Sequence, residues 1–105
     1  MISIISPFYN EEIILDKAID EMLKNLKGLD QPWELILVND GSTDSSLEIA
    51  VGKADINSNV KVVTYSVNRG RGNALRQGIN SARGDIIITT EIDCSWGNNI
   101  VNELV

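Results

Sequence analysis

Short apolar runs alternate along the chain with stretches whose apolar residues recur every three or four positions. The runs cover residues 2–5, 33–38, 60–65 and 86–88 and are rich in isoleucine, valine and leucine, as buried strands are. The apolar positions of the helical stretches are Leu15, Ala18, Ile19, Met22, Leu23 and Leu26, then Leu47, Ala50, Val51 and Ala54, then Leu75, Ile79 and Ala82. The pattern predicts strand, helix, strand, helix, strand, helix and strand in that order.

Proline, glycine and small polar residues mark the expected ends of the first strand and first helix. Pro7 should stop the first strand, because proline cannot donate to a sheet ladder. Asn10 is the expected N-cap of the first helix, with acidic residues in its first turn. Gly28 is the expected end of that helix.

Similar signals bound the later elements. Thr43 or Asp44 is the expected N-cap of the second helix, and Gly84 is the expected C-terminal glycine of the third. The run Ile86 to Ile88 is apolar without alternation, which predicts a central strand covered on both faces.

Strand and helix alternation of this kind predicts an α/β fold: a Rossmann-like, mostly parallel sheet with helices on both faces. Open sheets of this class bind ligands beyond the carboxyl ends of their strands. The loops after the four predicted strands are residues 6–10, 39–44, 66–73 and 91–97, and they hold most of the unusual polar residues. We therefore expect a functional site at that edge.

Composition narrows the chemistry. The 105 residues suit one small domain, and the net charge of -6 argues against a nucleic-acid partner, which usually needs a basic face. The chain has no histidine, so proton and metal chemistry would fall to carboxylates. The single cysteine, Cys94, excludes an internal disulfide and fits a reducing compartment. With no signal peptide and no transmembrane-length apolar run, the expected location is cytoplasmic.

Two acids follow the fourth predicted strand. Glu91 and Asp93 are two residues apart, so in an extended segment both side chains point the same way. Oxygen ligands of this kind suit Mg²⁺ or Mn²⁺, especially a cation that also holds phosphate. An isolated pair of this type is more often two solvated acids, so the assignment depends on the surrounding loops.

Two arginines and an aspartate in neighbouring loops strengthen the case. Arg69 and Arg71 alternate with two glycines, which suits a diphosphate held close to the backbone. The alternative is that these arginines only solvate the loop. Asp40 follows the second strand, from where it could accept a hydrogen bond from a base or ribose; the alternative, capping, suits Asp44 better. Phe8 and Tyr9 offer rings for stacking or for packing.

Four blocks of the chain, in order, resemble the family 2 glycosyltransferases, enzymes of the GT-A fold that move a sugar from a nucleotide donor. Residues 4–12 look like the family's opening strand and its P-x-Y-N-E-E loop. Residues 37–44 are similar to its V-x-D-G-S-x-D segment. Residues 68–75, followed by 82–85, look like its N-x-G-x-G-x-A and A-x-G-D blocks. The likeness runs nearly end to end, which makes it far more specific than any one block.

The resemblance implies roles for individual residues. Those expected to surround the nucleoside or lie near its base and phosphates are Pro7, Tyr9, Glu11, Asp40 and Arg71. Residues 91–93 take the place of the D-x-D metal motif, with Asp93 as the main ligand of Mn²⁺ or Mg²⁺. Glu91 is one methylene longer than the family's aspartate and would contact ribose or metal.

The resemblance also implies partners. The donor would be a UDP- or GDP-sugar and the acceptor a saccharide or a lipid phosphate, since residues 93–96 are similar to a segment of polyprenyl-phosphate sugar transferases. Family members continue beyond the metal motif with an acceptor-binding half that holds the general base. We therefore expect residues 1–105 to be the nucleotide-sugar-binding portion, truncated after the motif, with no catalytic base to name and with further segments holding it at the cytoplasmic face of a membrane.

Two other functions stay open at this point. One is a non-catalytic nucleotide-binding or assembly module. The other is a receiver-like signalling domain with Asp40 or Asp93 as phosphoacceptor. In any of these cases an exposed sheet edge would allow homo-oligomers to form.

Overall fold

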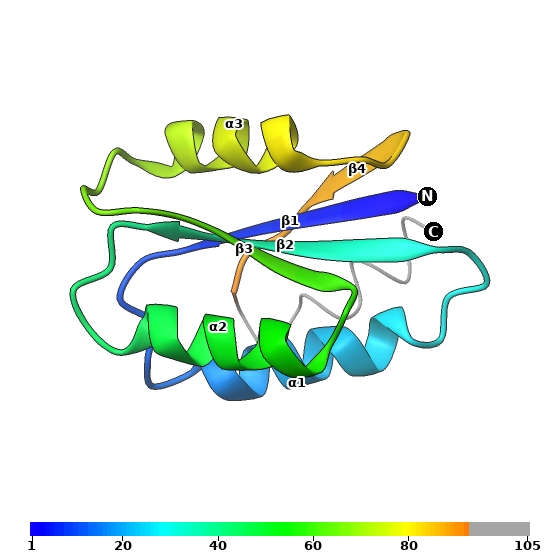
Figure 1. Ribbon diagram of the computed structural model, residues 1–105, viewed down its shortest axis with the longest axis horizontal. Helices are drawn as coiled ribbons and strands as arrows, with labels where there is room; N and C mark the ends of the chain where they lie inside the picture. Colours follow the sequence, from blue (N-terminus) through cyan, green and yellow to red (C-terminus); the bar gives the residue numbers. More distant parts are fainter. Residues whose placement is uncertain (93–105) are drawn as a thin grey trace.

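The structure is a computed structural model that describes residues 1–92. All seven predicted elements are present in the predicted order (Figure 1). They are β1 (Ile2–Phe8), α1 (Leu15–Leu26), β2 (Trp33–Asp40), α2 (Ser46–Ile56), β3 (Val60–Tyr65), α3 (Arg71–Ser81) and β4 (Ile86–Thr89). The spacing of Ile100, Val101, Leu104 and Val105 also predicts the start of a further helix, which lies outside the described residues.

The strands form one parallel sheet in the order β3-β2-β1-β4. Helices α1 and α2 cover one face, and α3 covers the other (Figure 1). The predicted α/β fold with helices on both faces is therefore confirmed. All strands run in the same direction, so their carboxyl ends and the loops that follow them gather at one edge.

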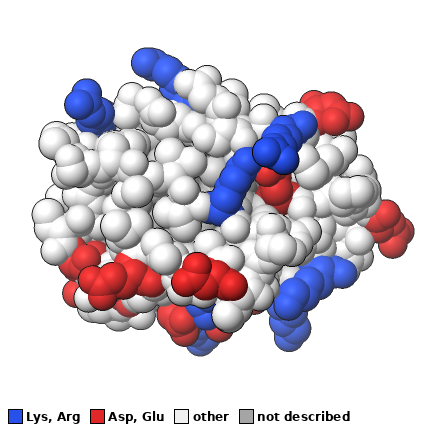
Figure 2. All heavy atoms as spheres, viewed as in Figure 1, with Lys and Arg blue, Asp and Glu red and all other residues white. Residues whose placement is uncertain are grey.

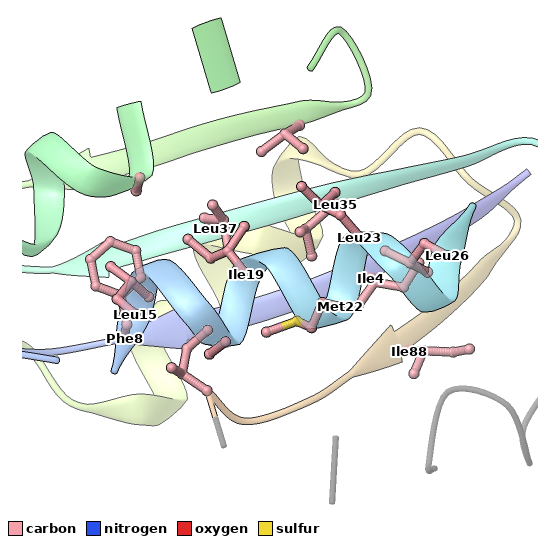
Figure 3. Close-up of a cluster of buried hydrophobic side chains, with 14 of the residues drawn as sticks. Ile4, Phe8, Leu15, Ile19, Met22, Leu23, Leu26, Leu35, Leu37 and Ile88 are labelled. Atoms are coloured by element: carbon pink, nitrogen blue, oxygen red, sulfur yellow. The ribbon is translucent and has the colours of Figure 1, made fainter. Parts of the chain in front are cut away.

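Helix α1 supplies most of the core on its side of the sheet. Its side chains Leu15, Ile19 and Leu26 are fully buried and pack against the strands (Figure 3). Opposite them lie Leu35 and Leu37 of β2, also fully buried. Burying one such side chain contributes about 1.5–3 kcal/mol, so this face dominates the stability of the fold.

The face of α3 that packs on the sheet is made of smaller residues than the periodicity predicts. Ala74 and Gly78 are the buried positions of α3, whereas Ile79, predicted to point inward, is 45% exposed. The prediction was wrong for Ile79, whereas Leu75 and Ala82 are partly buried and pack against this core. The helix meets Ile5 and Val38 most closely through its smallest residues, Ala74 and Gly78. Small residues let the helix approach the sheet closely, and a pattern of large apolar residues cannot reveal that.

Strand β4 lies at the edge of the described sheet and not at its centre. Ile86 is 50% and Ile87 42% exposed, while Ile88 is buried. The prediction of a strand covered on both faces was therefore wrong for residues 1–92. The continuous apolar run arises because Ile88 faces α1 and its neighbours lie at an edge that the described residues do not cover.

Two predicted boundaries also differ. Strand β1 continues through Pro7 to Phe8. Strand β4 pairs with β1 only as far as Ile5, so no carbonyl of β4 needs a hydrogen bond from the nitrogen of Pro7. Gly84 does not cap α3, which ends at Ser81. A Cβ at residue 84 would lie 2.5 Å from Met1 O and 2.6 Å from Ser3 Oγ, so glycine is required there by close packing.

A buried polar cluster around Glu34 links the strands at the amino edge of the sheet, opposite the loops that follow the strands. The Glu34 carboxylate accepts hydrogen bonds from Ser3 Oγ at 2.6 Å and Arg83 N at 2.7 Å, and it pairs with Lys61 Nζ at 3.1 Å. Ser3 Oγ in turn accepts from Gly84 N at 2.8 Å. Burial raises the pKa of Glu34, but these hydrogen bonds and Lys61 outweigh it, and the net pKa is lowered. The cluster thus favours a charged Glu34.

Over residues 1–92, no helix has both the length and the apolar character needed to cross a membrane.

Candidate functional site

A cleft of about 370 Å³ opens at the carboxyl edge of the sheet. Its lining residues come from the ends of β1, β2 and β4 and from the loop before α3: Pro7, Phe8, Tyr9, Glu11, Asp40, Asn68, Gly70, Arg71 and Glu91. All six residues that the sequence analysis assigned to nucleotide binding line this cleft. The volume lies within the range of small-molecule sites.

The loop after β1 is fastened to the loop after β2. Asn10 has a positive φ of 51°, and its Oδ1 accepts a hydrogen bond from Thr43 N at 2.8 Å. Asn10 N donates to Ser42 Oγ at 3.0 Å, and Glu11 N donates to Ser46 Oγ at 2.8 Å. These bonds fix the backbone that carries Glu11 into the cleft.

Neither predicted helix cap has the expected position. Helix α1 begins at Leu15 without a side-chain cap, because Asn10 is used to bridge the two loops. Helix α2 begins at Ser46, with Ser45 and not Thr43 or Asp44 at the N-cap. Asp44 still accepts a hydrogen bond from Ser46 N at 2.9 Å, so its carboxylate supports the helix start from one position further out.

Asp40, at the end of β2, is 5% exposed and holds the loop that precedes α3. Its Oδ1 accepts from Tyr65 Oη at 2.6 Å and from Arg69 N at 2.9 Å. Its Oδ2 accepts from Asn68 Nδ2 and from Gly70 N, both at 3.1 Å. The carboxylate therefore forms one wall of the cleft with each oxygen already bonded twice.

An ion pair spans the cleft. Arg71, the first residue of α3, lies 2.6 Å from Glu91 just beyond β4, measured from Nη2 to Oε1. The two side chains are 56% and 40% exposed. An exposed pair of this kind contributes about 0–1 kcal/mol, so a ligand can separate it at little cost. Arg69 does not line the cleft; its backbone N–H bonds to Asp40 instead.

Glu11 is the acid of the cleft whose pKa is raised by its surroundings. Burial raises the pKa of Glu11, and the carboxylates of Asp44 and Glu91 raise it further. Glu11 therefore holds its proton more strongly than a free glutamate does. On the face shown in Figure 2, acidic side chains gather along the lower left, on the side of the sheet that α1 and α2 cover.

The principal predicted metal ligand, Asp93, lies outside the described residues. Within residues 1–92, no group of three or more histidine, cysteine, aspartate or glutamate side chains is arranged to hold a metal ion. Glu91, the other predicted ligand, lines the cleft.

The two aromatic residues at the end of β1 differ in exposure. Phe8 is 3% exposed and belongs mainly to the core under α1, which favours packing over stacking. Tyr9 is 44% exposed at the cleft. Only the tyrosine ring is free to lie against a planar ligand.

Residues 3–105 match the protein family described as Glycosyl transferase family 2. The chain belongs to this family. Membership confirms the resemblance seen in the sequence and removes the receiver-like alternative for this family 2 chain.

Curated relatives agree with the family. An undecaprenyl-phosphate 4-deoxy-4-formamido-L-arabinose transferase of Proteus mirabilis is 39% identical over 93 residues, covering 88% of the chain and 28% of the relative. A dolichyl-phosphate beta-glucosyltransferase of Trichomonas vaginalis is 34% identical over 97 residues, covering 88% of the chain and 30% of the relative. The family 2 chain thus spans less than a third of the length of these relatives.

Solved structures show the same fold. A mannosyltransferase from Pyrobaculum calidifontis, in complex with GDP-Man and Mn²⁺, superposes with a TM-score of 0.71 at 28% identity, covering 88% of this chain and 27% of that one. Glucosyl-3-phosphoglycerate synthase from Mycobacterium tuberculosis, with Mn²⁺, UDP and phosphoglyceric acid, gives a TM-score of 0.68 at 30% identity, covering 89% and 33%. The GT-A assignment of this family 2 chain is therefore confirmed.

Sequence reasoning missed two contributors to the site. Tyr65 and Asn68 both donate hydrogen bonds to Asp40, and neither was singled out. Asn68 opens the block that resembles the family's N-x-G-x-G-x-A, so its position carried a signal. Tyr65 carried only a weak signal, as a polar aromatic residue at the end of β3.

Proposed function

We propose that this chain binds a nucleoside-diphosphate sugar together with a divalent cation, and is the donor-binding portion of a glycosyltransferase. The observation that carries the proposal is the cleft itself, in which six residues from four separate segments converge: Pro7, Tyr9, Glu11, Asp40, Arg71 and Glu91. They lie at the carboxyl edge of a parallel sheet, where such folds bind ligands.

Each part of the donor has a chemical counterpart in the cleft. The exposed Tyr9 ring suits a base or ribose, and the Arg71 guanidinium suits phosphate oxygens. Glu91 and Asp93 would hold the cation, Mn²⁺ or Mg²⁺. When bound, that cation would supply positive charge against the departing diphosphate. The role of this chain's own residues is to bind and orient the donor.

The names of the relatives suggest the wider reaction. Two are named for undecaprenyl- and dolichyl-phosphate, and neighbouring structures contain GDP-Man, UDP and UDP-GlcNAc. We propose a UDP- or GDP-sugar as donor and a polyprenyl phosphate or a saccharide as acceptor, with the whole protein acting at the cytoplasmic face of a membrane. Formation of homo-oligomers through an exposed sheet edge stays a prediction.

The test is calorimetric titration of UDP and of GDP into the full chain, with and without Mn²⁺. We expect binding of one nucleotide to depend on the metal and to be lost in Asp93→Ala. Arg71→Ala should weaken binding about tenfold, because a charged hydrogen bond to phosphate is worth about 1.5–3 kcal/mol against the small cost of splitting the pair with Glu91.

Two variants serve as controls. Arg76→Ala removes an exposed arginine from the same helix but outside the cleft, and Asp55→Ala removes an exposed acid from α2. Both should bind as the wild type does. Failure of both nucleotides to bind would contradict the proposal. Sugar transfer by this chain to a polyprenyl phosphate would exclude the non-catalytic module.

A further inference from the structure

The carboxylate of Asp40 has no vacant acceptor position. A carboxylate offers about four lone-pair sites, and four donors already occupy them: Tyr65 Oη, Arg69 N, Asn68 Nδ2 and Gly70 N, at 2.6 to 3.1 Å. A ligand N–H could bond to Asp40 only by displacing one of these groups. What Asp40 visibly does in the free protein is hold the loop of residues 68–70.

That loop sets the entrance to α3. Two successive backbone N–H groups, of Arg69 and Gly70, point at the carboxylate, so the anion lies in a small concavity of amides just before the helix. Gly70 has φ 92° and ψ 164°, a conformation essentially confined to glycine. The next residue is Arg71, which reaches into the cleft. The position of Arg71 therefore depends on how Asp40 is held.

Tyr65 holds the Asp40 carboxylate from the side of the sheet, outside the cleft. Its hydroxyl donates the shortest of the four bonds, and its ring is partly buried on β3 against the core under α3. It does not line the cleft. The other side-chain donor, Asn68, belongs to the exposed loop itself, so only Tyr65 ties the carboxylate to the rigid sheet through a side chain.

We infer that Tyr65 is a positioning residue of the donor cleft: its hydroxyl orients the Asp40 carboxylate, which holds residues 68–70 and so places Arg71 for the diphosphate. The step to the diphosphate rests on the function proposed above. The step from Tyr65 to the loop does not, because all of its bonds are present in the free protein.

The test compares Tyr65→Phe with Thr64→Val. Each variant removes one hydroxyl from adjacent positions of β3; Thr64 Oγ1 accepts only a bond from Asn39 Nδ2, at 2.9 Å, and lies outside the loop. Hydrogen exchange of the free protein, followed by NMR, should show the Arg69 and Gly70 amides exchanging about tenfold faster in Tyr65→Phe than in the wild type, as loss of a charge-assisted bond implies. In Thr64→Val these amides should be unchanged.

Nucleotide titration provides the second measurement. The dissociation constant of the nucleotide that binds wild type should rise about tenfold in Tyr65→Phe and stay constant in Thr64→Val, with similar thermal midpoints in the two variants. Unchanged exchange at residues 69 and 70 would overturn the inference. So would tighter nucleotide binding in Tyr65→Phe, which would mean that the hydroxyl had been blocking Asp40 from a ligand.

A second variant covers the case in which Tyr65→Phe folds poorly. Asn68→Ala removes another donor to Asp40 from the exposed loop without touching the core, and should also speed exchange of the Arg69 and Gly70 amides. Unchanged exchange there would count against the holding of the loop by Asp40. If wild type binds neither UDP nor GDP, the proposed function fails, while the exchange data still decide whether Tyr65 and Asp40 hold the loop.

Discussion

Replacing Gly41 with alanine should lower the free energy of unfolding by about 4 kcal/mol and disrupt the donor cleft. Gly41 has φ 71°, which costs any other residue about 1–3 kcal/mol. An added Cβ would also collide with backbone atoms of the loop before α3: Asn68 N, Val67 C at 2.5 Å and Asn68 Cα at 2.9 Å. Relief of that overlap would push the loop before α3 away from Asp40.

The matched control is Gly52→Ala in α2. Gly52 is exposed, and a Cβ there would meet no atom within 4 Å. Alanine in a helix interior is favoured over glycine by about 1 kcal/mol, so this variant should be slightly more stable than wild type. Urea unfolding of the three proteins measures both effects. Equal stability of Gly41→Ala and the wild type would show that the two loops are not packed as described.

Much of the fold could be predicted from the periodicity of apolar residues, because the buried face of a helix or strand repeats along its own segment. The α1 stripe from Leu15 to Leu26 predicted its own buried face correctly, since a helix against a sheet must bury one side. The pattern failed where packing depends on the absence of a side chain, as at Gly78, a buried residue of α3. It failed again at Ile86, whose exposure depends on which strand neighbours β4 and not on its own segment.

The site followed the same division. The carboxyl edge of the sheet, and with it Asp40 and Arg71, was predictable because parallel strands must end together. The partners of those residues were not. Asn10 fits an N-cap by sequence, yet it bonds to Thr43, a contact between two loops that no local pattern encodes. Tyr65 acquires its role only because β3 lies next to β2.

Glu34→Gln should lower the free energy of unfolding by about 3 kcal/mol at neutral pH. Glu34 is 8% exposed and accepts from Ser3 Oγ and Arg83 N while pairing with Lys61. The amide keeps the volume of the side chain but loses its charge, and its NH₂ group cannot accept a hydrogen bond. Asp55→Asn, the same chemical change on the exposed surface of α2, should alter stability by less than about 0.5 kcal/mol.

The pH dependence separates loss of charge from loss of packing. The pKa of Glu34 in the folded protein is lowered from its ordinary value of 4.5, so the native state favours the charged form more than the unfolded state does. Its stabilisation is complete above that ordinary value and is lost as the pH falls through the lower, folded pKa. The difference in unfolding free energy between wild type and Glu34→Gln should therefore be constant from about pH 6 to pH 8, where Glu34 is ionised in both states, and shrink on acidification. A difference that stayed constant down to the acid limit of folding would mean that Glu34 acts by shape alone, and that its charge does not help to hold β1, β2 and β3 together.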